Sequence, residues 1–286
     1  MIAESTGKQG KGIIPVVGEP VGAPEVYGAD RLFVAITLDG AQDPSQEAAL
    51  SALERAGQPV VRIVLRDAYD LGGEFVRWEV ATATAGALLG VDPFDEPNVQ
   101  ESKDNTRRLL REFEQKGALP DHRPLLENGL SVFAAAPTAT LLRRAPDSVA
   151  ALRRFTSEVG PHDYLAITAY LPRAEETEAQ LTRLRTVLRD RHRVATTLGF
   201  GPRFLHSTGQ LHKGGPPCGV FLQITHSAKV DMPVPGAPYS FAVLEQAQAL
   251  GDLQSLQSRR LRAIRVDLGA DIDEGLDRLL HAFDAG

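Results

Sequence analysis

The chain has 286 residues, of which 43% are hydrophobic and 24% are charged, and its formal net charge is −6 at pH 7. This length and composition predict a globular protein of one large or two ordinary domains. The negative charge argues against a nucleic acid or a membrane surface as partner. The single cysteine, Cys218, excludes an internal disulfide and a metal site built from thiolates.

No apolar run reaches ~20 residues, and the first twelve residues are polar and rich in glycine. We therefore expect neither a transmembrane helix nor a secretory signal, and a cytoplasmic location. Residues 1–28 predict the end of a helix followed by an extended loop, because three glycines and then three prolines oppose helix formation. Lys8 and Lys11 lie among these glycines, but their spacing is not that of a phosphate-binding loop.

The next segment predicts one β-α-β unit. Compact apolar runs at 32–38 and 59–65 are typical of buried strands, and a helix is expected between them at about 45–56. Residues 73–89 have apolar side chains at spacings of three and four, which predicts an amphipathic helix with Trp78 in the core.

The stretch D-P-F-D-E-P-N-V-Q-E-S-K, from Asp92 to Lys103, predicts a turn that leads into another helix. Asp95 is a suitable N-cap, and the helix is expected from Pro97 to about residue 116, with Gly117 ending it. Lys103 then lies in the second turn, beside a buried edge. By residue type alone, a lysine there is most often a solvated surface charge.

A polar, proline-marked link at 119–124 predicts a boundary between residues 1–117 and residues 118–286. Beyond it, strands are expected about every thirty residues, with helices between most of them. The expected strands are 130–135, 164–170, 193–198, 219–225 and 263–268, and the helices are 147–159, 175–191, 203–213 and 240–258. This alternation predicts a parallel sheet covered on both faces, with ligand crevices at the carboxyl ends of its strands. No G-x-G-x-x-G follows a strand, so a nicotinamide cofactor is not expected.

Residues 199–217, G-F-G-P-R-F-L-H-S-T-G-Q-L-H-K-G-G-P-P, hold two histidines and two hydroxyl residues at a strand-to-helix turn. Ser207 and Thr208 at a helix start are suited to phosphate binding through backbone N–H groups. His206 and His212 are six residues apart, a spacing that does not favour zinc, and no metal is expected. Two structural histidines are an equally good interpretation.

Two short strings in this chain, taken together, resemble glucose-6-phosphate isomerases. They are E-S-T-G-K, at 4–8, and F-D-E-P-N-V-Q-E-S-K, at 94–103, in the same order as in that family. The family commonly has Gly-Val-Glu where this chain has Asn98-Val99-Gln100. Residues 199–217 resemble the C-terminal part of the isomerase half of bacterial transaldolase/glucose-6-phosphate isomerase fusions, a likeness that covers essentially the whole chain.

The resemblance implies an α/β fold of the three-layer αβα sugar-isomerase (SIS) type with parallel sheets. Residues 1–117 would be the C-terminal part of an SIS domain, an N-terminally truncated first unit. Residues 118–286 would be a second, doubly wound unit, the additional α/β domain of the fused isomerase.

The implied activity is interconversion of D-glucose 6-phosphate and D-fructose 6-phosphate in glycolysis and gluconeogenesis, through an enediol and with no cofactor. The resemblance places the catalytic base at Glu4 and a ring-opening lysine at Lys103. The family's ring-opening histidine, in a Gly-Gln-His string after G-E-P, is missing here. We take His206 as its substitute, with His212 second.

The expected substrate-binding residues are His212, Ser207, Thr208 and Lys8, and the expected partner is a phosphorylated hexose. The family's sites are completed across a dimer, so a homodimer or a partner phosphate-binding SIS domain is also expected. The family's other SIS domain would precede Glu4, which leaves open whether this chain is active alone. The alternative is a non-catalytic module that binds sugar phosphate or serves assembly. A doubly wound NAD-dependent dehydrogenase is disfavoured by the absent glycine motif.

Overall fold

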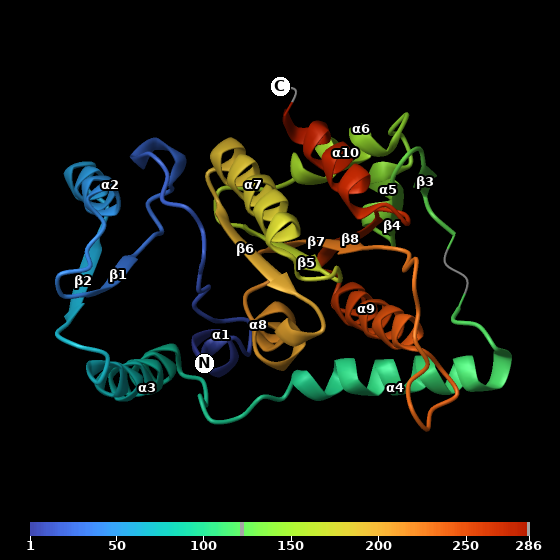
Figure 1. Cartoon of the computed structure of the whole chain (residues 1–286), viewed down its shortest axis with the longest axis horizontal. Helices are drawn as coiled ribbons and strands as arrows, with labels where there is room; N and C mark the ends of the chain where they lie inside the picture. Colours follow the sequence, from blue (N-terminus) through green and yellow to red (C-terminus); the bar gives the residue numbers. More distant parts are fainter. Residues whose placement is uncertain (121–122, 285–286) are drawn as a thin grey trace.

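The computed structural model describes residues 1–120 and 123–284, so that residues 121–122 of the predicted link lie outside the described residues. The described chain forms a two-stranded sheet and a six-stranded sheet. Figure 1 shows them in two bodies, a small one built around β1 and β2 and a large one built around the remaining strands. The α/β class and the mostly parallel sheets agree with the prediction.

The large sheet has the strand order β3-β4-β8-β7-β5-β6. Its strands are β3 (Leu126–Glu127), β4 (Ser131–Ala134), β5 (Tyr164–Ala169), β6 (Ala195–Phe200), β7 (Gly219–Thr225) and β8 (Arg262–Asp267). The last four run parallel to one another, while β4 is antiparallel to both β3 and β8. The prediction of a parallel strand at 130–135 was therefore wrong. A tight turn at Gly129, with φ +76°, joins β3 to β4, and strands joined by so short a turn can pair only antiparallel.

Helices cover both faces of this sheet, as a doubly wound order requires. Figure 1 shows α6 (Ser148–Thr156), α7 (Glu175–His192) and α10 (Ile272–Asp284) on one side of the sheet. The other side carries α8 (Thr208–Gly214), α9 (Phe241–Ser258) and α4 (Val99–Lys116). A short helix, α5 (Thr138–Leu142), follows β4 and packs against α6.

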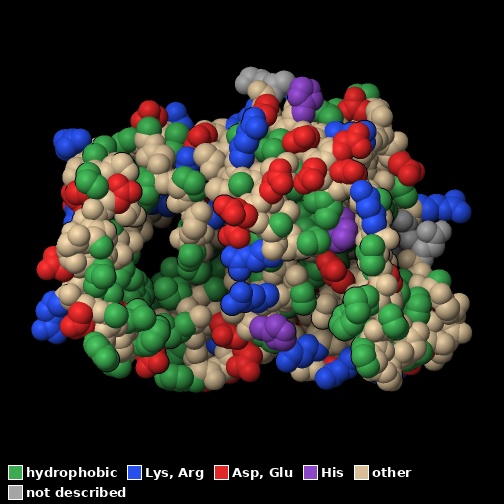
Figure 2. Space-filling view, viewed as in Figure 1, with side chains coloured by type: hydrophobic (Ala, Val, Ile, Leu, Met, Phe, Trp, Pro, Cys, Tyr) green, Lys and Arg blue, Asp and Glu red, His purple; other side chains and the backbone are tan. Residues whose placement is uncertain are grey.

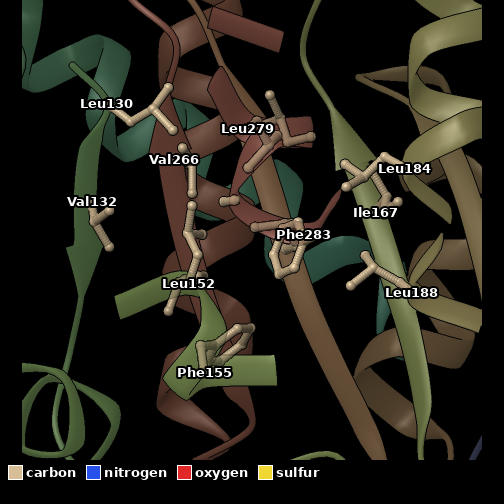
Figure 3. Packing of buried hydrophobic residues seen from close by; sticks show 14 of the residues in the cluster. Leu130, Val132, Leu152, Phe155, Ile167, Leu184, Leu188, Val266, Leu279 and Phe283 are labelled. Atoms are coloured by element: carbon tan, nitrogen blue, oxygen red, sulfur yellow. The ribbon is translucent and has the colours of Figure 1, made fainter. Parts of the chain in front are cut away.

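The main core lies between the sheet and the first helix layer. Figure 3 shows Leu279 and Phe283 of α10 directed at Val266 of β8 and Ile167 of β5, close to Leu184 of α7. Every residue of β5 and of β7 is buried, which explains why both strands are apolar along most of their length rather than alternating.

The α4 helix ends at Gly117, with φ 72°, as predicted, but it begins at Val99 with Asn98 as the preceding residue. Asp95 is therefore not its cap. The helix lies along α9, where a Cβ at Gly251 would make a tight contact of 3.1 Å with Thr106. Elements on both sides of the predicted boundary at 117 and 118 thus pack together, and the division into two domains stays a prediction.

The small body contains the predicted β-α-β unit. Strands β1 (Phe33–Leu38) and β2 (Val60–Leu65) are parallel, and α2 (Pro44–Arg55) joins them. Asp43 caps α2 by accepting a hydrogen bond of 2.8 Å from the backbone N–H of Ser45. Leu50 and Leu53 of α2 pack on one face of the sheet.

The α3 helix (Asp70–Leu89) follows β2 but does not have the predicted burial. Trp78 is only half-buried, and Phe75 is 62% exposed. The physical reason is that α3 packs chiefly against α1 (Ile2–Thr6) and Pro93, so that most of its circumference meets no other element.

Residues 13–27, which we call the strap, run from α1 to the small body in the predicted extended form, apart from one turn of 3-10 helix, η1 (Pro24–Val26). Glu19 of the strap is 3.8 Å from the guanidinium of Arg185 and 3.5 Å from that of Arg189, both on α7, and its side chain is 10% exposed. Thr196 of β6 donates a hydrogen bond to the same carboxylate. The strap is therefore fixed to the large body by buried charges.

Candidate active site

The α8 helix holds together the two segments that resemble isomerases. The side-chain amide of Gln210 donates hydrogen bonds of 2.9 Å to the carbonyl oxygen of Gly7 and to Oδ1 of Asn98. Its Oε1 accepts a hydrogen bond of 2.8 Å from the backbone N–H of Asn98. Gln210 is fully buried, so E-S-T-G-K and the turn before Lys103 are joined through one side chain.

Glycines make this contact close. A Cβ at Gly7 would lie 2.4 Å from Cα of Leu211, and a Cβ at Gly214 would lie 2.8 Å from the carbonyl oxygen of Gly7. The backbone N–H of Gly10 donates a hydrogen bond of 2.9 Å to the carbonyl oxygen of Gly214. The glycines of both strings therefore serve the packing of α1 on α8.

Replacement of Gly7 by alanine is expected to separate α1 from α8 and to lower the free energy of unfolding by roughly 1–3 kcal/mol, the usual cost of overpacking. The matched control is Gly73→Ala, in α3, where an added Cβ meets nothing within 4 Å. That control is expected to stabilise the protein slightly, because alanine is the better helix former. Urea unfolding followed by circular dichroism measures both. Equal midpoints for the two variants would contradict the packing role.

Lys8 does not have the exposure that a phosphate ligand needs. Its side chain is 2% exposed, and its amine lies 2.7 Å from Oδ1 of Asp95, the aspartate of the F-D-E turn. The same amine also donates to the backbone carbonyl oxygen of Asp95. In this structure Lys8 and Asp95 tie the loop after α1 to the turn before α4.

The three predicted catalytic residues come from elements around α8. Glu4 is half-buried on α1, which packs against α8, while Lys103 is exposed in the second turn of α4. His206 is exposed at the end of η2 (Arg203–His206), a 3-10 helix that contacts both α8 and α4. Within the described residues, no hydrogen bond or ion pair joins these three side chains. Figure 2 shows acidic, basic and histidine side chains close together over α1 and α8.

The predicted helix at 203–213 is in fact two short helices, η2 and α8, separated at Ser207 by a backbone with φ −149° and ψ −77°. Ser207 and Thr208 are half-buried, and the side chain of Ser207 makes no capping hydrogen bond to α8. The break places the two histidines in different surroundings, because His206 ends one helix and His212 lies inside the other.

His212 is buried among aromatic rings. The ring centroids of Phe221, Phe204 and Tyr164 lie 5.0, 5.9 and 6.4 Å from its own, and it is 5% exposed. Neither ring nitrogen has a hydrogen-bond partner. Burial, together with the neighbouring charge of Lys213, lowers its pKa to about 3. This geometry makes His212 a neutral packing residue and not a group that meets substrate.

His212 is expected to make the protein acid-sensitive. Its pKa is lowered in the folded state, so below about pH 6.5 the unfolded chain binds a proton that the folded chain does not. The contribution of neutral His212 to the free energy of unfolding is therefore fully present above about pH 6.5. As the pH falls toward 3, the free energy of unfolding decreases by up to about 1.4 kcal/mol per pH unit. His212→Leu removes this one-proton slope, whereas the exposed His206→Gln leaves it. Unfolding free energies measured from pH 7 to pH 4 test the difference.

Lys213 and Asp252 form a buried ion pair that the sequence interpretation missed. Nζ of Lys213 lies 3.1 Å from Oδ1 of Asp252, and the two side chains are 0% and 1% exposed. The available signal was Asp252 itself, a carboxylate inside the apolar run A-L-G-D-L of α9. The pair joins α8 to α9.

The described residues contain neither a cluster of metal ligands nor a helix that could span a membrane. No group of three or more His, Cys, Asp and Glu side chains is placed to hold a metal ion in residues 1–120 and 123–284. Over the same residues, no helix has the length and apolar character needed to cross a bilayer. A hollow of about 510 Å³ lies at the far end of α4 from Lys103, between Phe113 and residues 231–240.

No protein-family model matches the chain. It is 37% identical over 89 residues to the "Probable glucose-6-phosphate isomerase" of Natronomonas pharaonis, a match that covers 30% of this chain and 21% of that protein. It is 29% identical over 146 residues to the glucose-6-phosphate isomerase of Enterococcus faecalis, covering 38% of this chain and 32% of that protein. The chain thus spans between a fifth and a third of the length of these relatives.

Among solved structures, the crystal structure of a hypothetical protein from Thermus thermophilus covers 87% of this chain and 55% of its own, with 15% identity and a TM-score of 0.38. The two sequence matches relate the chain, distantly and over part of its length, to sugar-phosphate isomerases. Both of these relatives are named as glucose-6-phosphate isomerases.

Proposed function

We propose that this chain supplies part of the active site of a glucose-6-phosphate isomerase. The observation that carries the proposal is the bridge made by Gln210. It joins the string that contains Glu4 to the turn that leads to Lys103, two segments about ninety residues apart in sequence. The partial similarity to glucose-6-phosphate isomerases supports the same assignment.

Glu4 is the proposed base. An aldose–ketose isomerase moves a proton between C2 and C1 of the open-chain sugar through an enediol, and a carboxylate on one side of the substrate suits that step. The carboxylate of Glu4 is half-buried and has no ion-pair partner in the described part of the chain, so no neighbouring charge holds it away from a substrate.

Lys103 and His206 are the proposed ring-opening groups. Opening of the cyclic sugar needs an acid at the ring oxygen and a base at the anomeric hydroxyl. Both side chains are exposed, and neither forms a hydrogen bond within residues 1–120 and 123–284. Ser207 and Thr208, half-buried beside His206, remain proposed substrate contacts. Lys8 and His212 are no longer among them, because the one is paired with Asp95 and the other is enclosed by rings.

A coupled assay tests the proposal. Fructose 6-phosphate is supplied to the purified chain, and glucose 6-phosphate is detected with glucose-6-phosphate dehydrogenase and NADP⁺. The assay is repeated with the part of the Enterococcus faecalis enzyme that lies outside the matched segment, expressed as a separate polypeptide. Turnover in either preparation is the expected result. Its absence from both, with the two polypeptides folded, would contradict the enzymatic assignment.

A second function is favoured by one specific observation, the small share of the relatives that the chain matches. A module of this size could bind sugar phosphate without converting it. Equilibrium binding of radiolabelled fructose 6-phosphate, without turnover in either preparation above, is the result expected of such a module.

A further inference from the structure

The buried ion pair of Lys213 and Asp252 links α8 to α9, and the proposed reaction does not use it. Figure 1 shows α1, α8 and α9 side by side, and α4 lies along α9. Among the hydrogen bonds and ion pairs of residues 1–120 and 123–284, this pair alone joins α8 to α9. The place of the short helix α8 on α9 therefore depends on packing and on this one polar contact.

The pair is poorly suited to a role in stability alone. Nζ of Lys213 and Oδ1 of Asp252 are 3.1 Å apart, yet neither Nζ nor either carboxylate oxygen forms a hydrogen bond within the described residues. Burial of two charges costs free energy, and an apolar pair of similar volume is often as stable or more stable. Apolar packing tolerates small shifts, however, and repacked cores lose their unique arrangement before they lose stability. An ion pair at one fixed distance resists such shifts.

The ammonium of Lys213 is aligned with the face of α8 that bears Gln210. A Cβ at Gly209, one turn before Lys213, would lie 3.2 Å from Nζ, so that glycine leaves room for the ammonium. Lys213 and Gln210 are three residues apart on the same helix, and such residues are neighbours on the helix surface. A rotation of α8 that moves the ammonium away from Asp252 therefore also moves the amide of Gln210.

The α9 helix also holds the helix that carries Lys103. Nδ2 of Asn105, on α4, donates a hydrogen bond of 2.9 Å to Oγ of Ser255, on α9. Arg259, directly after α9, forms an ion pair with Glu101 of α4. Both α4 and α8 are thus fixed to α9 by polar contacts.

The α8 helix in turn holds the segment that carries Glu4. The short helix α1 packs on α8, and the backbone N–H of Gly10 donates a hydrogen bond of 2.9 Å to the carbonyl oxygen of Gly214. A continuous series of contacts therefore leads from Glu4 to Lys103, through α1, α8, α9 and α4. The buried ion pair lies in this series at the step from α8 to α9.

We propose that Lys213 and Asp252 are positioning residues, which set the distance between Glu4 and Lys103 through the place of α8 on α9. This role rests on the proposed function, in which Glu4 and Lys103 act on one substrate. The side chains of the pair are 0% and 1% exposed, so they act through α8 and not on substrate. A misplacement of about 1 Å at a reacting group can reduce a rate about 10²-fold.

The test uses the double variant Lys213→Met with Asp252→Leu, which removes both charges and is expected to keep the fold. Hydrogen exchange of the amides of Gly10 and Asn98, both bonded to α8, is expected to be at least tenfold faster than in the wild-type chain. Exchange in β5 is expected to be unchanged, because core strands open only with the whole fold. In whichever preparation shows turnover, kcat is expected to fall at least tenfold, with KM within threefold.

A second variant, Gly209→Ala, keeps both charges. Its added methyl group crowds Nζ of Lys213, so exchange of the same two amides is expected to be at least twofold faster. The matched control is Ser148→Ala, which removes a buried hydrogen bond to the carbonyl oxygen of Leu130 on the other side of the sheet. It is expected to leave kcat and the exchange of both amides within twofold, which separates positioning from a general loss of stability.

Wild-type exchange at Gly10 and Asn98 in the double variant would overturn the proposal, as would faster exchange with an unchanged kcat. If the double variant does not fold, wild-type exchange in Gly209→Ala overturns it instead. The two readouts separate this proposal from the proposed function. Without turnover by the wild-type chain in either preparation, the isomerase assignment fails, and exchange alone decides whether the pair sets the place of α8. Turnover with unchanged exchange in the variants keeps the assignment and removes the positioning role.

Discussion

Replacing Asp252 with alanine is expected to lower the free energy of unfolding by about 3–5 kcal/mol, because it leaves the buried ammonium of Lys213 without its counter-charge. The two side chains are 1% and 0% exposed, so water cannot take the place of the lost carboxylate. The loss is a large fraction of the roughly 5–15 kcal/mol by which native domains are stable, and part of the variant is expected to be unfolded at 37 °C.

Two further variants identify the cause of the stability loss in Asp252→Ala. The double replacement Lys213→Met and Asp252→Leu removes both charges and is expected to recover most of the stability, because an apolar pair avoids the cost of desolvation. Lys229→Ala breaks an exposed lysine–aspartate pair, in which the side chains are 62% and 55% exposed, and is expected to leave the unfolding midpoint unchanged. Urea titrations at pH 7 measure all three. A double variant less stable than Asp252→Ala would show that packing, and not the unpaired charge, determines the loss.

Glu4→Gln is expected to reduce the isomerisation rate about 10²–10⁴-fold, the usual contribution of a general base, in whichever preparation shows turnover. The amide keeps the size of the side chain but cannot accept the proton from C2. The fold is expected to persist, since Glu4 makes no ion pair in the described part of the chain. Circular dichroism checks the fold, and the coupled assay measures kcat.

The control for Glu4 is Glu96→Gln. Glu96 is an exposed glutamate in the turn before α4, close to the proposed site but without an assigned role, and its replacement is expected to leave kcat within twofold. A Glu4→Gln variant that kept the wild-type rate would remove Glu4 as the base. A different carboxylate near α8 would then have to act as the base.

The elements that were predicted well are those in which burial or a cap leaves a recognisable pattern in the local sequence. Strands β5 and β7 are covered on both faces, and their apolar runs gave their positions to within one residue. The α9 helix was predicted within one residue at its start, where Ser240 caps it. Gly117 marked the end of α4 because a left-handed backbone there favours glycine.

Other elements depend on contacts that a local pattern does not contain. The direction of β4 is set by the turn at Gly129 and by its pairing with β8, more than a hundred residues away. The α10 helix was missed although Leu276, Leu279 and Phe283 follow helical spacing, and its apolar side fills the core beside β5 and β8.

Local sequence was a poorer guide to the candidate site than to the fold. Lys8 was expected to bind substrate, yet only tertiary structure shows that it is buried against Asp95. The same holds for His212, whose burial depends on rings from β5, η2 and β7. Gln210 carried no distinguishing pattern, because an amide between Gly209 and Leu211 is equally common on a surface.

The strap has a mechanical consequence for Glu4. Between α1 and the small body the chain is fastened to α7 by Glu19, through Arg185 and Arg189. The small body has a second connection to the rest of the molecule, because α3 packs chiefly against α1, the helix that carries Glu4. The small body is thus held at two places, by the strap at α7 and by α3 at α1, so that a displacement of α3 is passed directly to the helix that carries the Glu4 carboxylate.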